Sequence, residues 1–324
     1  MSMSISSGSI TAGPMTAGPI TAGSMTSGSM TSGSMMGIGP MRWNALVSAE
    51  ELATAIGQPD LVLIDARFGL GDAEQGERDY AMAHLPGAVY AHLDRDLSDH
   101  SRQGHGRHPL PDAKSFCAKL GAWGITPAHQ VVVCDARDGA MAAARAWFLL
   151  RLLGHQRVAV LDGGYTRWSQ LGLPLSADAV PPVPAAYVAD YDARMLANAD
   201  ELSHPTDADA PRLIDARAAE RFSGDVEPFD LVAGHVPGAV NRPFAQNLQG
   251  DGRFRPVAEL EHEFHALLDG RAPDRAVLMC GSGVTACHNL LAMEHADLHG
   301  ARLYAESWSG WISDPSRPIA LGAA

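Results

Sequence analysis

Short apolar runs alternate with longer stretches of helical character along most of this chain. The run "VVVCD" at 131–135 is followed by "AMAAARAWFLLRLLGH" at 140–155 and then by "VAVLDGG" at 158–164. A strand, a helix and a second strand joined by short glycine-bearing turns are typical of a parallel sheet flanked by helices. The pattern therefore predicts an α/β architecture.

The series of segments occurs twice. Three motifs of the first half return in the same order in the second half: "LVLIDAR" (61–67) as "PRLIDAR" (211–217), "AHLPGAV" (83–89) as "GHVPGAV" (234–240), and "VVVCDARDG" (131–139) as "AVLMCGSGV" (276–284). Repetition in a constant order predicts a duplicated domain. Because the "IDAR" box occurs in both copies, we expect Arg67 and Arg217 to have a structural role, in a salt bridge that supports the adjacent loop.

Length and composition allow two domains. The chain has 324 residues, of which 46% are hydrophobic, enough for two domains that each bury a core. We expect a non-catalytic N-terminal domain at 42–176, a Pro- and Ala-rich linker at 177–187 and a catalytic C-terminal domain at 188–324. Residues 1–41 repeat Gly, Ser and Thr without any charge, so we expect a disordered low-complexity tail, or sequence upstream of a start near Met41.

Charge and cysteine content limit the functional classes. The formal net charge of −13 argues against general electrostatic binding to nucleic acid or to an anionic membrane. No apolar stretch has membrane-spanning length. The four cysteines form no CxxC pair and no zinc-type spacing with histidine. We therefore expect a reduced, cytoplasmic protein that contains no structural disulfide, metal or cofactor.

A glycine-rich turn follows one of these cysteines. In "VLMCGSGVTACHN" an apolar strand ends at Cys280, and a helical pattern begins at Ala286. Gly281 and Gly283 let successive N–H groups point inward, and the helix start adds partial positive charge, so a thiolate would be stabilised there. A buried structural cysteine is the alternative. Cysteine-dependent phosphatases need an arginine at the position of Ala286, so phosphate-ester chemistry is disfavoured.

These motifs together resemble the two-domain rhodanese superfamily of sulfurtransferases. The loop is most similar to that of the 3-mercaptopyruvate sulfurtransferases, because thiosulfate-preferring members usually carry basic residues where this chain has Gly281 and Ser282. The resemblance implies that Cys280 takes sulfur from 3-mercaptopyruvate as a persulfide, releases pyruvate, and passes the sulfur to a thiol or cyanide. Thioredoxin is one candidate acceptor. A thiosulfate:cyanide sulfurtransferase and a non-turnover protein sulfur carrier are the alternatives.

The resemblance also implies supporting residues. Asp94 and His108 match the family's aspartate and histidine, and with Ser282 they would form a proton relay; the alternative is that they only stabilise a loop. In the first copy Asp135 stands where Cys280 stands in the second, and a carboxylate cannot act as the sulfur nucleophile. Cys134, one residue earlier, is expected in the core.

Substrate binding is assigned to the C-terminal copy. Arg221 matches the family arginine that binds the substrate anion. The stretch "EPFDLVAGH" lacks the second arginine that the family carries there, and Arg242 is a candidate to replace it. The loop residues that would present N–H groups to the substrate sulfur are Gly281, Ser282, Gly283, Val284 and Thr285. Thr285 is also expected to cap the following helix, and Cys287 to be packed.

Overall fold

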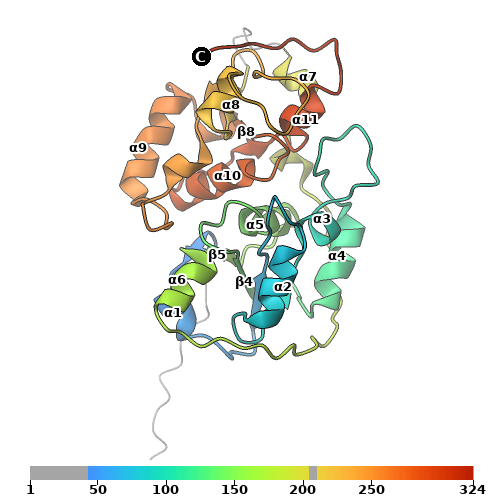
Figure 1. Cartoon of the computed structure of the whole chain (residues 1–324), viewed down its shortest axis with the longest axis vertical. Coiled ribbons are helices and arrows are strands. Elements are labelled where there is room, and N and C mark those ends of the chain that lie inside the picture. The colour runs from blue at the N-terminus through green and yellow to red at the C-terminus, as the bar shows by residue number, and fades with distance from the viewer. Residues whose placement is uncertain (1–42, 204–209, 324) are drawn as a thin grey trace, which may run out of the picture. The chain divides into compact units, whose positions relative to one another are not determined.

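The computed structural model describes residues 43–203 and 210–323 (Figure 1). The tail predicted for residues 1–41 lies outside the described residues. Both halves of the described chain contain a parallel sheet with helices packed against it, as the alternating pattern predicts.

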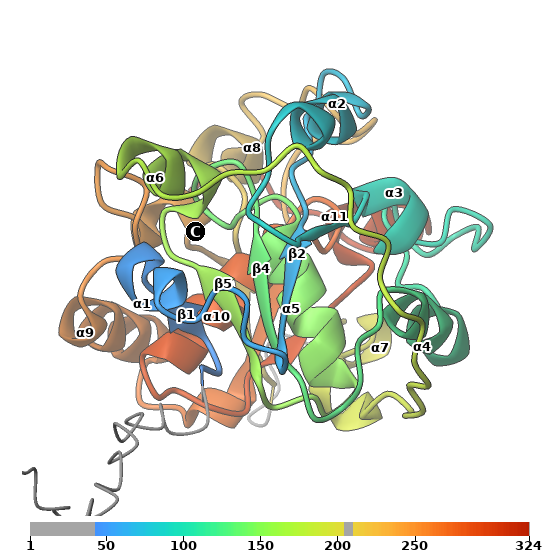
Figure 2. The same ribbon diagram turned by 90° about the horizontal axis from the view of Figure 1, so that it is seen from below.

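The N-terminal half forms a five-stranded sheet in the order β1-β5-β4-β2-β3, in which all neighbouring strands are parallel. Figure 2 shows β5, β4 and β2 side by side, with helices around them. Its elements are β1 (Leu46–Val47), α1 (Ala49–Ala53), β2 (Leu61–Asp65), α2 (Gln75–Met82), β3 (Val89–Tyr90), α3 (Leu93–Asp96), α4 (Ala113–Ala122), β4 (Gln130–Cys134), α5 (Ala143–Leu152), β5 (Val158–Leu161) and α6 (Gly164–Gln170).

The C-terminal half forms a four-stranded parallel sheet in the order β7-β6-β8-β9. Its strands are β6 (Arg212–Asp215), β7 (Val240–Asn241), β8 (Ala276–Met279) and β9 (Arg302–Leu303). Its helices are α7 (Ala199–Leu202), α8 (Ala219–Ser223), α9 (Val257–Leu268), α10 (Ala286–His295) and α11 (Ser307–Trp311), with 3-10 turns η1 (Ala193–Met195), η2 (Phe244–Asn247) and η3 (Pro273–Arg275). The carboxyl ends of parallel strands lie at one edge of a sheet, which is where such folds place ligands.

Helices α5 and α10 pack against each other and join the two halves. Almost every residue of both helices is buried, because each lies between its own sheet and the other helix. The largest hydrophobic cluster contains residues of both halves, including Trp147 and Phe148 from α5 and Leu291 from α10. Smaller clusters lie on the other face of each sheet. The expectation that each domain buries a core of its own is therefore only part of the picture, since the main core is shared.

The arginines of the repeated "IDAR" boxes make equivalent contacts in the two halves. Arg67 binds the Asp65 carboxylate at 2.7 Å and donates to the Ala83 carbonyl at 2.6 Å. Arg217 binds Asp215 at 2.7 Å and donates to the Gly234 carbonyl at 2.8 Å. In both copies the arginine thus ties the end of a central strand to the residue before the histidine of the "H(L/V)PGA" box. The predicted structural salt bridge is confirmed.

The histidines of these boxes also have matching partners. His84 exchanges backbone hydrogen bonds with Ser176, and His235 exchanges them with Ala320. The segment after the last helix of each half is therefore fastened to the box of that half.

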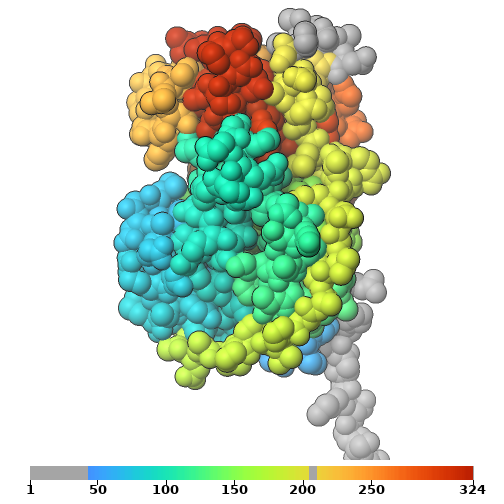
Figure 3. All heavy atoms as spheres, turned by 90° about the vertical axis from the view of Figure 1, so that its right-hand side faces the viewer, coloured from blue at the N-terminus to red at the C-terminus, as the bar shows by residue number. Residues whose placement is uncertain are grey.

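The predicted linker contains no helix or strand and crosses the N-terminal domain. Ala185 N–H donates to the Gly121 carbonyl at 2.8 Å, and the Tyr187 hydroxyl lies 3.0 Å from His155 Nδ1. Figure 3 shows this yellow-green segment as a band over the teal and green atoms of that domain. Glycine at position 121 permits the approach, because a Cβ there would lie 2.5 Å from the Ala185 oxygen. The segment is extended and bound to the domain surface.

Removal of the Arg217 guanidinium should destabilise the protein strongly. The side chains of Asp215 and Arg217 are 0% and 1% exposed, so Arg217→Ala leaves a carboxylate buried without its counter-ion. We expect a loss of about 3–5 kcal/mol in the free energy of unfolding, measured by urea denaturation. Arg194→Ala is the matched control, because Arg194 also pairs with an aspartate two residues earlier, but its side chain is 90% exposed. Equal losses in the two variants would contradict the structural role of Arg217.

Candidate active site

Cys280 lies at the carboxyl end of β8, where the chain turns toward α10. The residue is 2% exposed, and its Sγ accepts a hydrogen bond of 3.1 Å from the Gly283 N–H. Gly283 has a φ of +76°, and a Cβ on it would lie 2.2 Å from the Ala305 carbonyl oxygen. Only glycine allows this backbone to curl under the sulfur. The turn therefore directs a peptide N–H at the thiol, as the glycine pattern predicts.

The start of α11 holds the loop from its other side. The Ser307 hydroxyl accepts from the Cys280 N–H at 3.0 Å, while the N–H groups of Trp308 and Ser309 donate to the carbonyls of Cys280 and Gly281. Trp308 is fully buried. The loop is thus bonded through its backbone on both sides of the thiol.

The three residues proposed for a proton relay contact one another in series at this loop. His108 Nδ1 is 2.8 Å from the Ser282 hydroxyl, and His108 Nε2 is 3.3 Å from Asp94 Oδ1. Asp94 belongs to α3, and His108 to the long loop between α3 and α4. His100, half-exposed in the same loop, also lies 3.3 Å from Asp94. The N-terminal domain thus supplies two of the three residues, and His100 is a neighbour that the sequence motif did not indicate.

Burial lowers the pKa of His108 to about 4, and the positive charge of Arg145 adds to the effect. The carboxylate of Asp94 opposes the shift, while Arg107 and His100 reinforce it. His108 is therefore neutral at pH 7. A neutral imidazole can accept a proton through one nitrogen and donate through the other, as a relay requires.

Arg145 connects the two domains beneath the relay. This residue of α5 is fully buried, and it donates to the Gly283 and His108 carbonyls, both at 3.0 Å, and to the Leu97 carbonyl at 3.4 Å. It was not predicted as a site residue. A single charge inside the apolar stretch "AAARAWFLL" was the available signal, because a buried guanidinium needs specific acceptors.

Arg221 in α8 lies beside the thiol loop. A Cβ placed on Gly281 would lie 3.3 Å from both Nη atoms of Arg221 and 3.0 Å from Nη2 of Arg107. Arg221 also makes a two-pronged ion pair with Glu227, whose shortest contact is 2.8 Å. Arg107, the residue before His108, was not predicted, although its place beside a matched histidine was a signal. The structure thus brings two guanidinium groups to Gly281.

Arg242 lies elsewhere. Its side chain is 5% exposed and contacts Glu263 of α9 at 2.5 Å and Asn247 at 3.1 Å, with its guanidinium over the Phe264 ring. These contacts fix the start of η2 against α9. Arg107, not Arg242, is the second arginine that the described structure places beside Gly281.

The remaining loop residues differ in their surroundings. Val284 is 3% exposed and belongs to the shared core. Thr285 occupies the cap position of α10, but its side chain makes no capping hydrogen bond. The predicted side-chain cap is therefore wrong, because Thr285 has a helical backbone (φ −71°, ψ −15°) that does not aim the hydroxyl at the first free N–H groups.

All four cysteines are free and buried. Cys134 lies inside β4, as predicted, and burial raises the pKa of its thiol well above the usual range. Burial likewise raises the pKa of Cys287 to about 12. Both thiols are packed in their protonated form.

The loop of the first copy keeps the same turn around a carboxylate. Asp135 follows β4 as Cys280 follows β8, and its Oδ1 accepts from the N–H groups of Gly139 at 2.9 Å and Arg137 at 3.3 Å. Burial raises the pKa of Asp135 to about 6. Residues of the C-terminal domain cover this loop: His288 Nε2 lies 3.0 Å from the Asp138 carbonyl, and Arg137 Nη2 donates to the Gly250 carbonyl at 3.4 Å.

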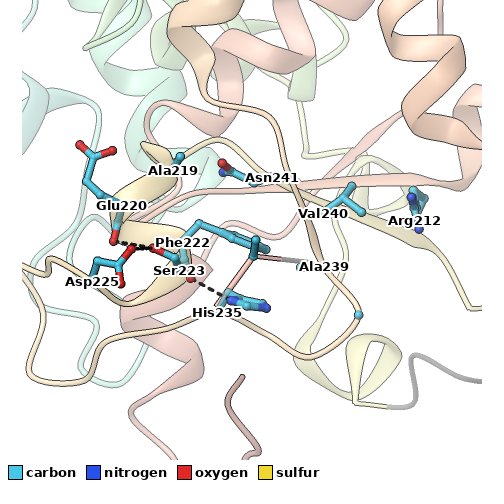
Figure 4. Close-up of a pocket in the computed structure, with 12 residues that line it drawn as sticks. Arg212, Ala219, Glu220, Phe222, Ser223, Asp225, His235, Ala239, Val240 and Asn241 are labelled. Atoms are coloured by element: carbon cyan, nitrogen blue, oxygen red, sulfur yellow. Dashed lines mark hydrogen bonds between the residues drawn. The ribbon is translucent and has the colours of Figure 1, made fainter. Parts of the chain in front are cut away.

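One cavity of the structure lies apart from this loop. It has a volume of about 1060 Å³ and is lined by residues of β6, α8, β7 and the segment between α8 and β7, among them Phe222, His235 and Asn241 (Figure 4). His235 Nδ1 is 2.8 Å from the Phe222 carbonyl, so the histidine is held by the domain's own backbone. None of the lining residues belongs to the loop 280–285.

Among the described residues, no group of three His, Cys, Asp or Glu side chains could hold a metal ion.

Comparison with known proteins decides the family. The rhodanese-like domain family matches residues 48–171 and 198–314. The chain belongs to the rhodanese family. A Pseudomonas aeruginosa protein described as a probable 3-mercaptopyruvate sulfurtransferase is 48% identical over 279 residues, 86% of this chain and 98% of that protein. Human 3-mercaptopyruvate sulfurtransferase is 35% identical over 282 residues, 84% of this chain and 93% of the human one.

Solved structures agree with these sequence relatives. The crystal structure of SseA from Escherichia coli, described with the fold and catalytic mechanism of such enzymes, superposes with a TM-score of 0.71 at 31% identity, over 82% of this chain and 100% of the other. The chain is therefore an enzyme of the sulfurtransferase class. Within residues 43–203 and 210–323, no helix is long and apolar enough to cross a membrane.

The low pKa of His108 makes stability depend on pH. Between about pH 6.5 and pH 4 the unfolded chain binds a proton here that the folded protein does not, so the free energy of unfolding falls as pH is lowered through this window. For His108 alone we expect a loss of about 2 kcal/mol between pH 7 and pH 5. His108→Gln should lack this component. Urea denaturation of both proteins at the two pH values tests it, and equal losses would overturn the assignment.

Proposed function

We propose that this sulfurtransferase moves sulfane sulfur from 3-mercaptopyruvate to a thiol or cyanide acceptor through a persulfide on Cys280, and that it releases pyruvate. One observation carries the proposal. The Cys280 thiol, the Ser282 hydroxyl bound to His108, and the Arg221 guanidinium meet at a single loop. The names of the P. aeruginosa, human and E. coli relatives support 3-mercaptopyruvate as the donor.

In the first half-reaction the Cys280 thiolate attacks the sulfur of the donor. A sulfur–sulfur bond forms, and the bond between that sulfur and carbon 3 breaks. The electron pair leaves with carbon 3 as the enolate of pyruvate. The proton of the donor thiol passes through Ser282 and His108 and is returned to carbon 3, so the step yields pyruvate and a deprotonated persulfide. A relay of this kind contributes about 10²–10⁴-fold to the rate.

Groups in the loop stabilise the charges that this step creates. The Gly283 N–H already donates to Cys280 Sγ. The N–H groups of Gly281, Ser282, Val284 and Thr285 are assigned to the outer sulfur of the persulfide, where preorganised donors favour developing negative charge. Asp94 orients His108 and stabilises its protonated form.

In the second half-reaction the acceptor attacks the outer sulfur and releases the Cys280 thiolate. Small thiols, cyanide and thioredoxin are the acceptors we propose. We therefore divide the chain by function. Residues 42–176 form a non-catalytic domain that contributes Asp94 and His108. Residues 177–187 connect it to the catalytic domain, residues 188–324, which carries the nucleophile.

Cys280→Ser should reduce pyruvate release from 3-mercaptopyruvate to the uncatalysed level, because a hydroxyl cannot hold the sulfane sulfur. Cys117→Ser is the matched control, since the Cys117 thiol donates to the Ala189 carbonyl at 3.5 Å and a hydroxyl can do the same. Mass spectrometry of the wild-type protein after incubation with 3-mercaptopyruvate should show one added sulfur on the Cys280 peptide. Active enzyme with that peptide unmodified would refute the persulfide.

A second candidate donor is thiosulfate. A Mycobacterium tuberculosis relative with a provisional thiosulfate sulfurtransferase name is 39% identical over 292 residues, 87% of this chain and 99% of that protein. We expect kcat/KM with 3-mercaptopyruvate to exceed that with thiosulfate, and the reverse order would favour this candidate. A persulfide that forms with either donor but is not discharged by small thiols or cyanide would indicate a sulfur carrier.

A further inference from the structure

Two arginines from different domains flank the residue that follows the nucleophile. Arg221 comes from α8, and Arg107 from the α3–α4 loop of the N-terminal domain. A Cβ on Gly281 would lie 3.0 Å from Arg107 Nη2 and 3.3 Å from both Nη atoms of Arg221. Both guanidinium groups therefore lie beside the thiol loop, where a donor whose sulfur approaches Cys280 can place its charged end.

The loop that carries Arg107 is fastened to the C-terminal domain. The Arg107 N–H donates to the Ser309 hydroxyl at 3.0 Å, and His105 Nδ1 lies 2.7 Å from Glu306. Gly106 has a φ of +83°, and a Cβ on it would lie 2.5 Å from the Glu306 carbonyl oxygen. The position of Arg107 is thus built by specific contacts on both sides, so its approach to Gly281 is a property of the fold.

Two buried acids hold this arginine pair. Asp230 bridges it: one carboxylate oxygen binds Arg107, and the other lies 3.2 Å from Arg221. Glu227 binds Arg221 at 2.8 Å. The side chains of Asp230 and Glu227 are each 4% exposed. These acids lie in the stretch "EPFDLVAGH", where the family resemblance led us to expect an arginine.

The charges of the cluster are balanced. Burial opposes ionisation of Glu227, but hydrogen bonds from Arg221 and from the backbone of Phe229 and Asp230 prevail and lower the pKa of its carboxyl. Two guanidinium groups thus face two carboxyl groups. An arginine pair that is already neutralised presents directed N–H donors with little excess positive charge, which suits an anion of one charge better than a dianion.

We infer that Arg107 supplies the second guanidinium for the donor's carboxylate, and that Asp230 is the residue that tunes the site to a monoanionic donor over a dianionic one. The inference rests on the proposed function for the identity of the donor. Asp230 acts by bridging and neutralising the pair, so it is a specificity-determining residue, whereas Arg107 touches the substrate.

Asp230→Asn tests the charge argument. The substitution keeps the shape of the side chain and removes one negative charge, so the net charge of the cluster rises by one. We expect the ratio of kcat/KM for thiosulfate to kcat/KM for 3-mercaptopyruvate to rise at least about tenfold, which corresponds to about 1.4 kcal/mol. Asp225→Asn is the matched control. It changes the charge by the same amount in an exposed part of the same segment, where Asp225 accepts a hydrogen bond from Ser223. Equal ratios in the two variants would overturn the role of Asp230.

Arg107→Gln tests the second guanidinium. We expect KM for 3-mercaptopyruvate to rise about tenfold or more with a smaller change in kcat, because the carboxylate is bound equally in the ground and transition states. Arg107→Lys should recover only part of the loss, since a lysine lacks the planar fork. A change in kcat alone, with KM unaltered, would contradict carboxylate binding by Arg107.

A binding measurement separates this inference from the proposed function. Calorimetry on the Cys280→Ser protein needs no turnover, and pyruvate and sulfate serve as the monoanion and dianion probes. Asp230→Asn in that background should shift the ratio of the two affinities toward sulfate, and Arg107→Gln should weaken pyruvate. If these affinities shift while the wild-type protein fails to turn over 3-mercaptopyruvate, the anion site is upheld and the proposed function fails. If the wild-type protein turns over 3-mercaptopyruvate but the affinities do not shift, the proposed function is upheld and the roles of Arg107 and Asp230 are overturned.

Discussion

The buried guanidinium of Arg145 is the interaction on which the site depends. It donates hydrogen bonds to carbonyls from three separate segments: the end of α3, the loop that carries His108, and the turn beneath the thiol. Burial lowers the pKa of Arg145, and carbonyl oxygens can satisfy its N–H groups without neutralising its charge. The charge therefore acts on its neighbours, and it disfavours protonation of His108.

The position of the thiol loop depends on the hydrogen bonds of Arg145 and on the core that the two halves share. Because α5 and α10 bury nearly all of their residues against each other and their sheets, Arg145 has little freedom to move. The thiol loop begins at β8 and ends at α10, so its backbone is held at both ends by that core. The partner residues from the N-terminal domain then reach Ser282 and Gly281 over short paths.

Much of this could be predicted from the sequence, and the limits have physical reasons. The duplicated motifs predicted two parallel sheets, and the glycines after Cys280 predicted an N–H group aimed at its sulfur. The motif match named Asp94 and His108, which the structure brings to Ser282. Arg107 was missed because its approach depends on contacts between domains that no local pattern encodes. Arg242 was proposed for its position after the box, but Glu263 and Asn247 hold its side chain. Thr285 has the residue type of a cap with the wrong backbone angles.

The packing of the two loops is reciprocal. The N-terminal domain covers the loop of Cys280, and the C-terminal domain covers the loop of Asp135 through His288 and Gly250. Mutual coverage of equivalent surfaces is the pattern of an isologous twofold dimer, here joined in one polypeptide. Neither domain can move away without exposing both loops to water, that of Cys280 and that of Asp135. Because the unfolding of either half uncovers the loop of the other, we expect the two halves to unfold as one cooperative unit.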